Sequence, residues 1–305
     1  LTYRFYCVRN FLNCRYVRYW SALLFKELFS YIGWSLIGNL AWTFNSQGMN
    51  ILINMFFGPV FNATRGIASS VESAVSSFLY NFITPAVPPI IKAYAAGDID
   101  EMIRLSLRSS KLGFLLFMCL SLPLISVMNP ILKLWLIAPP PQSWTFCLLS
   151  LIYIQCNSLG GTLQNMVQAT GKVKRYQLSN GIVKIMALPI VYIIYKCGGD
   201  VVAYLWTLIL TSIVGLMVQL DAVRRLIDSF KISDYLKKVI MPALTAYLLP
   251  FLLSFYFSCM EMESLKMMET VAIMVVICLF SVWFIGFTGH ERSWILNIAK
   301  SKLYR

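Results

Sequence analysis

The sequence predicts an all-α integral membrane protein with about eight transmembrane helices and both termini on the same side of the membrane. Three observations predict this class: the composition, the long runs without charge, and the alternation of basic and non-basic connections. Of the 305 residues, 58% are apolar and only 13% are charged, and the mean hydropathy is +0.69. A soluble domain has about a quarter of its residues charged, and its core could not bury this much apolar material.

Eight long runs locate the predicted spans. A helix satisfies its own backbone hydrogen bonds, so it is the element expected in lipid, and about 20 residues cross the hydrocarbon core. Charge interrupts only two of the runs, at Glu72 in the second and at Lys184 in the fifth. The predicted spans cover residues 31–56, 66–91, 112–132, 143–171, 176–195, 201–220, 239–260 and 271–287.

The basic residues assign the two sides of the membrane. A net charge of +13 would by itself favour an acidic partner, but the 26 Lys and Arg residues are not clustered as a nucleic-acid footprint requires. Sorted by connection, 21 of the 26 fall on one side of the spans. By the positive-inside rule this side is cytoplasmic, and anionic lipid headgroups are its expected general partner. The other side carries only Arg65, Lys133, Lys196 and Lys266, and Lys184 lies inside a span.

These assignments divide the chain into four parts. Residues 1–27 are predicted to form a basic interfacial segment in the cytoplasm, and residues 28–220 a six-helix lobe. Residues 221–288 follow as an amphipathic connector with two further helices, and residues 289–305 as a cytoplasmic tail. The amphipathic stretches 98–110 and 221–238 are expected to lie on the cytoplasmic surface.

Uncharged polar side chains recur at helical spacing in the first span, within an arc of about 120° and over about 28 Å. Such a stripe either joins helices by hydrogen bonds or lines a water-filled cavity. We favour the cavity, because fewer residues would suffice to join helices. The stripe consists of Ser35, Asn39, Thr43, Gln47, Asn50 and Asn54. Further polar positions are Ser69, Glu72, Ser73, Ser76 and Tyr80 in the second span, Asn157, Gly161, Gln164 and Gln168 in the fourth, and Gln177, Asn180 and Lys184 in the fifth.

Glu72 and Lys184 are the ionisable residues expected inside the membrane. A charge at mid-bilayer costs at least about 2.5–3.5 kcal/mol, so it faces a partner or an aqueous path. Glu72, two turns into its span, is a candidate proton or cation site, a partner for Arg65 or Lys184, or a shallow structural group. Lys184, two turns from the cytoplasmic end, either extends to that interface or binds an anionic headgroup.

The segment TPAVPPI at residues 84–90 is expected to kink or end the second span. Proline lacks the backbone N–H that continues a helix and releases carbonyl groups from the hydrogen-bond ladder. Broken helices beside polar stripes are typical of secondary transporters.

The sequence contains few of the residues that catalytic and metal sites require. His290 is the single histidine, and the eight cysteines are scattered. Zinc sites and histidine-based triads therefore lack their components, and there is no phosphate-binding glycine loop. We predict no catalytic residue, no metal and no cofactor.

Five strings carry a family resemblance. They are NSQGMNILINMFFGPVFNATRGIA (45–68), FITPAVPPIIKAYAAGD (82–98), SSKLGFLLFMCLSLPL (109–124), ILKLWL (131–136) and QATGKVKRYQ (168–177). Together they resemble the polysaccharide-exporter (Wzx-like) branch of the multidrug/oligosaccharidyl-lipid/polysaccharide (MOP) flippase superfamily. The resemblance covers about residues 15–240, in the same order.

This resemblance implies a MATE-like architecture of two six-helix lobes, often followed by two extra helices. The chain looks like the second lobe with these two helices, so a partial protein without its N-terminal lobe is expected. Members of the family alternate access between the lobes around a cationic cavity. A polyprenyl-diphosphate-linked glycan, destined for lipopolysaccharide or another bacterial surface polysaccharide, enters this cavity headgroup first at the inner (cytoplasmic) membrane.

The resulting hypothesis is a non-enzymatic flippase half that translocates a lipid-linked oligosaccharide, with membrane lipids and the other lobe as partners and no nucleic acid. One alternative is a multidrug or cation antiporter of the same superfamily, with Glu72 as the coupling site. The other is an integral-membrane glycosyltransferase or polysaccharide polymerase, which would need a sizeable outer loop or paired acidic residues. The predicted substrate-binding residues are Asn39, Thr43, Gln47, Asn50, Asn54, Arg65, Glu72, Ser76, Gln164, Gln168 and Lys184.

Overall fold

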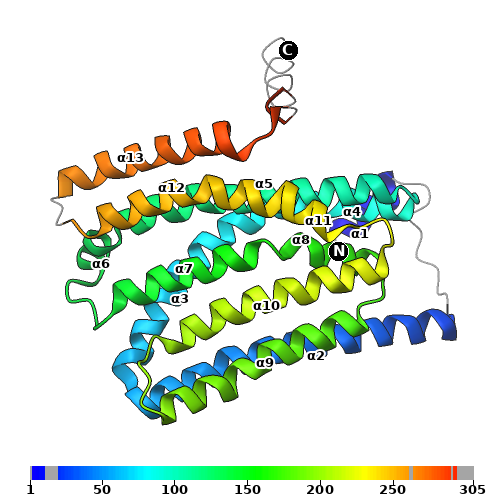
Figure 1. The fold of residues 1–305 in the computed structure, drawn as a ribbon. Helices are drawn as coiled ribbons and strands as arrows, with labels where there is room; N and C mark the ends of the chain where they lie inside the picture. The colour runs from blue at the N-terminus through cyan, green and yellow to red at the C-terminus, as the bar shows by residue number, and fades with distance from the viewer. Residues whose placement is uncertain (1, 11–19, 261–263, 290, 294–305) are drawn as a thin grey trace.

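The protein is a bundle of long helices, and the described part of the chain contains no β-strand (Figure 1). The computed structural model describes residues 2–10, 20–260, 264–289 and 291–293. His290, most of the predicted tail 289–305 and part of the predicted interfacial segment 1–27 lie outside these ranges.

The α-helices follow one another with short connections. They are α1 (Thr2–Asn10), α2 (Ala22–Phe57), α3 (Pro59–Ile83), α4 (Val87–Ala95), α5 (Ile99–Ser126), α6 (Met128–Leu136), α7 (Ser143–Ser158), α8 (Gly161–Ala169), α9 (Lys174–Lys196), α10 (Ala203–Leu226), α11 (Ile232–Tyr235), α12 (Met241–Ser258) and α13 (Ser264–Ser281). A 3₁₀ turn, η1 (Thr84–Ala86), and two π-helical turns, η2 (Leu236–Ile240) and η3 (Val282–Gly286), complete the elements.

Seven helical segments are long and apolar enough to cross a membrane, so the chain is a multi-pass helical membrane protein. This confirms the predicted all-α membrane class. Among the described residues seven segments qualify where the sequence predicted about eight, and the side on which the termini lie stays a prediction. With 36 residues α2 is longer than any single α-helix among the seven segments, but it is not one of the seven, because its amide side chains and its charges Lys26 and Glu27 lower its mean hydropathy. The seven segments are Pro59–Ala95, Ile99–Ser126, Ser143–Ala169, Lys174–Lys196, Ala203–Leu226, Ile232–Ser258 and Lys266–Gly286.

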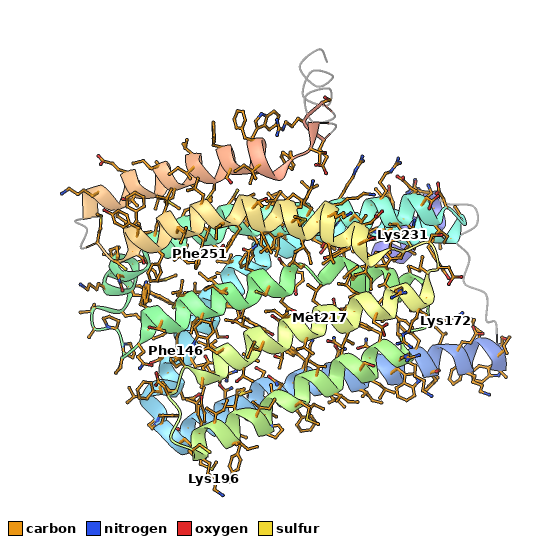
Figure 2. All side chains as sticks on the ribbon, in the orientation of Figure 1. Phe146, Lys172, Lys196, Met217, Lys231 and Phe251 are labelled. Atoms are coloured by element: carbon orange, nitrogen blue, oxygen red, sulfur yellow. The ribbon has the colours of Figure 1, made fainter. Side chains whose placement is uncertain are left out.

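The helices pack as two groups around α7. On one side α2 packs against α9, and α9 against α10; on the other side α12 and α13 pack against α5 (Figure 1). The side chains of α5 and α7 are the most enclosed, whereas large apolar side chains of α2, α10 and α13 point outward, as expected of surfaces that face lipid. Met217 of α10 is one of these outward side chains (Figure 2).

The proline-rich segment breaks the second long helix as predicted. The helix α3 ends at Ile83, the 3₁₀ turn covers Thr84–Ala86, and α4 resumes at Val87. The hydroxyl of Thr84 donates a hydrogen bond to the carbonyl oxygen of Tyr80 at 2.6 Å, and this oxygen also accepts the backbone N–H of Thr84, so the last turn of α3 is closed at the break.

The two amphipathic connectors predicted at 98–110 and 221–238 are not separate surface helices. Residues 99–110 form the first turns of α5, because Asp98 caps this helix through the N–H of Glu101 at 3.0 Å and no proline or glycine interrupts it before Gly113. The second stretch is divided at Ile227, whose extended backbone ends α10, and its later part leads through α11 and η2 into α12. Both stretches therefore continue membrane-spanning helices.

The ends of the bundle separate the predicted cytoplasmic and outer connections. Lys172 and Lys231, from two basic connections, lie at one end, and Lys196, from a sparse connection, lies at the other (Figure 2). We refer to these as the basic end and the sparse end.

A pair of reporter insertions tests this orientation. We expect a reporter inserted after Gly171 to lie in the cytoplasm and one inserted after Gly198 to lie outside, because positive loops are retained in the cytoplasm. Alkaline phosphatase and green fluorescent protein report the two compartments. Both insertions reporting the same side would contradict the arrangement.

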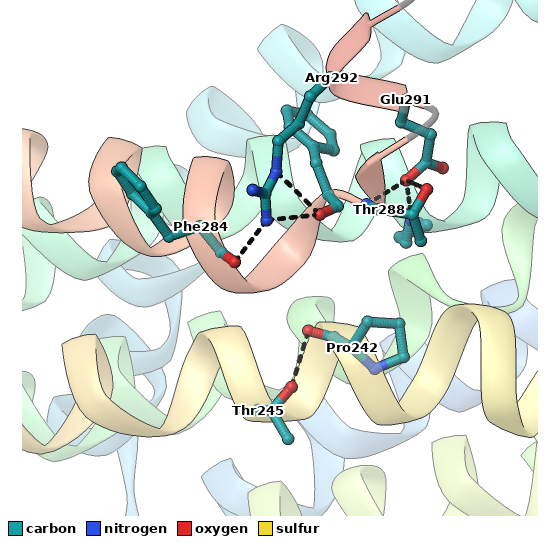
Figure 3. A network of polar contacts seen from close by, with 8 residues as sticks. Pro242, Thr245, Phe284, Thr288, Glu291 and Arg292 are labelled. Carbon is teal, nitrogen blue, oxygen red and sulfur yellow. Dashed lines mark hydrogen bonds and ion pairs between the residues drawn. The ribbon is translucent and has the colours of Figure 1, made fainter.

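A buried ion pair joins the segment after the last span to α5. The ammonium of Lys111, whose side chain is 3% exposed, lies 2.5 Å from Oε2 of Glu291. The same oxygen accepts hydrogen bonds from the N–H and the hydroxyl of Thr288, at 2.8 and 2.9 Å (Figure 3). Arg292 donates to the carbonyl oxygens of Phe284 and Phe287 and so closes the preceding turn. These contacts fix the chain where it leaves α13 and η3.

Removing one partner of this ion pair should destabilise the protein. Glu291→Gln leaves the Lys111 ammonium buried without a counter-charge, which costs about 3–5 kcal/mol. The double variant Glu291→Gln/Lys111→Met should recover part of this loss. Thermal unfolding in detergent measures both, and equal stability of the wild type and Glu291→Gln would contradict the assignment.

The ion pair also predicts a pH dependence. Partial burial alone would raise the pKa of Glu291, but hydrogen bonds from Lys111 and Thr288 outweigh burial and hold this pKa below its usual range. A depressed folded-state pKa stabilises the protein at neutral pH, and this stabilisation is lost as the pH falls below about 4 and through the folded-state value. Glu291→Gln should lose less stability than the wild type between neutral pH and this acidic range.

Candidate functional site

Five helices enclose a polar cavity of about 200 Å³ in the middle of the bundle. Its charged lining consists of Arg65 and Glu72 from α3 and Lys184 from α9. The remaining lining residues are Trp42, Asn45 and Ser46 from α2, Ser69 and Ser73 from α3, Ser150, Tyr153 and Asn157 from α7, Asn180 from α9, and Tyr204, Leu205, Leu208, Thr211, Ser212, Gly215 and Gln219 from α10.

Arg65 lies inside a helix, not in the turn where the sequence placed it. The helix α2 continues to Phe57 and Pro59 already begins α3, so Gly58 alone connects them. Gly58 adopts φ +83°, a conformation open to glycine, and its N–H caps α2 by donating to the Asn54 carbonyl oxygen at 3.0 Å. This one-residue connection carries Arg65 into the second turn of α3, where its side chain faces α2.

The guanidinium of Arg65 is held by three partners. It donates hydrogen bonds to the side-chain oxygen of Asn50 and, at 3.0 Å, to the carbonyl oxygen of Ser46. Its carbon lies 5.6 Å from the centre of the Tyr204 ring on α10, a favourable cation–π distance. The charge is therefore oriented by α2 and α10 toward the cavity.

Glu72 and Lys184 lie near the middle of their helices. Glu72 follows the start of α3 by about 20 Å, and Lys184 follows the start of α9 by about 15 Å, at 1.5 Å per residue. Both helices begin before the predicted spans, α3 at Pro59 and α9 at Lys174, so each residue lies farther from the start of its helix than from the start of its predicted span. Within the described ranges Glu72 forms no ion pair with Arg65 or Lys184. Two cations and one carboxylate thus share the cavity.

Amide side chains continue this polar interior. The side chain of Asn45 donates to the backbone carbonyl oxygen of Lys184 and joins α2 to α9. The amide of Asn180 donates to the hydroxyl of Tyr176 at 3.3 Å, and this hydroxyl donates to Gln164 at 3.3 Å. Gln164 is therefore linked to the cavity through a chain of hydrogen bonds.

A second polar hollow of about 250 Å³ adjoins the first, because Asn157 lines both. It contains two further predicted residues, Ser76 and Gln164, together with Tyr80 and Thr84 beside the helix break. The hydroxyl of Ser76 and the side-chain oxygen of Gln219 are buried and have no hydrogen-bond partner within the described ranges. Buried polar atoms in this state are free to accept a hydrogen bond from water or a ligand.

Most of the predicted α2 stripe faces away from the cavity. Of its members only Asn50 reaches the site, through its bond to Arg65. Four members are exposed on the outer surface of α2, namely Asn39, Thr43, Gln47 and Asn54. The predicted residue Gln168, in α8, lines neither hollow.

Sequence reasoning missed several lining residues. Asn45 and Gln219 could have been identified, because each is a polar residue within an otherwise apolar run. Tyr153 and Tyr204 gave no signal, because tyrosine is as frequent in apolar packing as in binding sites. Only the packing of α7 against α3 and of α10 against α7 brings these rings to the site.

Comparisons with protein-family models, curated proteins and solved structures find no match. The resemblance to polysaccharide exporters therefore remains a prediction.

The chemistry of the cavity favours binding of an anion with hydrogen-bonding groups. Arg65 and Lys184 supply positive charge, and amides, hydroxyls and tyrosines supply donors and acceptors. The described residues contain no cluster of His, Cys, Asp and Glu that could hold a metal ion.

Cysteine labelling tests whether the cavity contains water. In a chain whose native cysteines are replaced, we expect Ser73→Cys and Thr211→Cys to react with a membrane-impermeant maleimide, because a thiol must ionise in water to react. The matched controls are Leu279→Cys on the exposed apolar face of α13 and Ser254→Cys in the packed interior. Equal labelling of Ser73→Cys and Leu279→Cys would contradict an aqueous cavity.

Proposed function

We propose that the chain forms one lobe of a transporter that moves a lipid-linked oligosaccharide across the bacterial inner membrane. One observation carries the proposal: Arg65 and Lys184 line a polar cavity in the middle of a membrane-spanning bundle. Each such charge costs at least about 2.5–3.5 kcal/mol to place there, and intramembrane charges of this kind mark substrate pathways. A diphosphate linkage supplies the negative charge that the two cations fit.

The uncharged lining supports a glycan as the other part of the substrate. Sugar hydroxyls both donate and accept hydrogen bonds, and the lining offers both kinds of group, including the unpartnered acceptor of Gln219. At about 200 Å³ the cavity is below the range of about 300–1,000 Å³ of small-molecule pockets. It therefore accommodates the diphosphate and an adjoining sugar, and the remaining glycan lies outside it.

The exposed stripe of α2 supports a passage beside this lobe. Asn39, Thr43 and Gln47 are exposed on the surface of α2. The Thr43 hydroxyl donates to the Asn39 carbonyl oxygen and the Gln47 side-chain oxygen accepts from Asn50, but the side-chain amide of Asn39 and the amide nitrogen of Gln47 would lack hydrogen-bond partners in hydrocarbon. A water-filled passage between this lobe and a second lobe would satisfy them. In this arrangement α2 is an eighth span, the basic end is cytoplasmic, and the lobes alternate access to the passage.

A cation antiporter is the second candidate function. It is favoured by Glu72, which has no ion-pair partner in the described part of the chain and faces the same cavity. A membrane glycosyltransferase or polymerase is less well supported, because the cavity holds a single carboxylate where acid–base catalysis uses a pair.

Neutral substitutions of the two cations should impair translocation in the complete protein. For Arg65→Gln and Lys184→Gln we expect the rate to fall about 10- to 100-fold, because each loses a charged hydrogen bond to the diphosphate worth about 1.5–3 kcal/mol. Proteoliposomes loaded with a fluorescent polyprenyl-diphosphate oligosaccharide measure the rate. Lys133→Gln and Lys196→Gln, which remove the same charge elsewhere, should leave it unchanged.

Two outcomes would contradict the proposal. Unchanged translocation in both cavity variants would exclude this cavity as the diphosphate site. Loss of proton- or sodium-driven exchange in Glu72→Gln, with normal glycan translocation in Arg65→Gln, would favour the antiporter.

A further inference from the structure

A larger hollow, of about 1130 Å³, lies between the first turns of α2 and the turn that joins α8 to α9. We call it the basic groove, and it is separate from the polar cavity, with which it shares no residue. Lys172, at the basic end of the bundle, marks its position (Figure 2). Its basic side chains are Lys26, Lys172, Lys174 and Arg175.

The charge of the groove is not compensated. Glu27 is its single carboxylate, and within the described ranges none of its charged side chains forms an ion pair. The three cations beside the start of α9 also repel one another and the positive end of the helix dipole. That helix has neither a side-chain cap nor an acidic residue in its first turn. A bound anion would offset this repulsion.

Two contacts fix the cations in the groove. The ammonium of Lys174 lies 4.8 Å from the centre of the Trp34 ring, which holds it against α2. The backbone at Lys172 is fixed by a tight turn in which Gly171 adopts φ +71° and the Lys172 N–H donates to the Thr170 hydroxyl at 3.3 Å. The ammonium of Lys174 thus has a defined position relative to α2, and the backbone that carries Lys172 is fixed beside it.

Apolar side chains form the other wall of the groove. They include Leu23, Leu24 and Leu28 from the first turns of α2 and Leu178 from α9. Leu178, one turn farther into α9 than Lys174, is 37% exposed, so its apolar surface is open on the side of the groove nearer the membrane core. A wall of this kind fits acyl chains and not a free inorganic anion.

The length of α2 places the groove at the depth of lipid headgroups. Its 36 residues measure about 54 Å, whereas the hydrocarbon core is about 30 Å thick. The first turns therefore extend beyond the core on the basic side. Tyr31 and Trp34 border the groove at this level, where aromatic residues concentrate at membrane interfaces.

We propose that the basic groove binds an anionic phospholipid of the leaflet at the basic end. The phosphate lies among Lys172, Lys174 and Arg175, and the acyl chains run from there past Trp34 and Leu178 toward the hydrocarbon core. In this position the lipid contacts both α2 and α9, whose side chains line the groove. This site does not depend on the transport function, because it uses none of the cavity residues.

Native mass spectrometry of the full chain, purified in detergent, tests the site with phosphatidylglycerol as the probe. We expect the wild type to retain phosphatidylglycerol more tightly than phosphatidylcholine. The variant Lys172→Gln/Lys174→Gln/Arg175→Gln should bind it at least about tenfold more weakly, since each cation near an anionic headgroup contributes about a factor of five. The single variant Lys172→Gln, in an exposed turn, gives a smaller loss should the triple variant fold poorly.

The matched control is Lys92→Gln/Arg108→Gln/Lys237→Gln, which removes the same charge outside the groove. It should retain phosphatidylglycerol as the wild type does. If both triple variants bound phosphatidylglycerol equally weakly, the loss would follow from the lower net charge of the protein and not from the groove, and the site would be overturned. Equal retention of phosphatidylcholine, or displacement of phosphatidylglycerol by millimolar inorganic phosphate, would overturn the assignment to an anionic lipid.

Discussion

Arg65 places a full positive charge among apolar helices, and the arrangement around it depends on giving that charge partners. Hydrocarbon offers none, so the guanidinium is turned inward to Asn50, to the Ser46 carbonyl oxygen and to the ring of Tyr204. These contacts join α2, α3 and α10, and the cavity with Glu72 and Lys184 forms where these helices meet α7 and α9. The same requirement that excludes polar groups from lipid therefore gathers them into one site.

The interruptions of the helices serve this arrangement. Gly58 turns the chain in a single residue and keeps Arg65 within reach of α2. The 3₁₀ turn at Thr84–Ala86 breaks the α3–α4 helix beside the second hollow, where Ser76 and Gln164 meet. At the basic end, Gly171 positions Lys172 in the groove that we assign to a lipid.

The membrane-spanning class and the approximate positions of seven of the eight predicted spans could be predicted from the sequence, because hydropathy over about 20 residues is a local property. The helix ends could not. Asp98 caps a helix that starts well before the apolar run, and Ile227 ends one beyond it. Such ends depend on one capping residue or one residue with an extended backbone. Hydropathy averaged over about 20 residues does not register a single residue of this kind. In the same way, the start of α3 at Pro59, before the predicted span, places Glu72 nearer the middle of its helix.

The sequence by itself determined that the chain crosses a membrane, where its proline break falls and which of its residues carry unusual charge. Only the tertiary structure decided which polar residues share a site. A periodic stripe places Asn39 and Asn50 on one face of α2, but it does not say what that face meets. The packing of α3, α7, α9 and α10 turned Asn50 toward Arg65 and brought in Asn45 and Tyr204, and it left Asn39, Thr43 and Gln47 outside. Helical periodicity is a property of one segment, whereas a cavity is a property of several, and their relative rotation is set by side chains far apart in the chain.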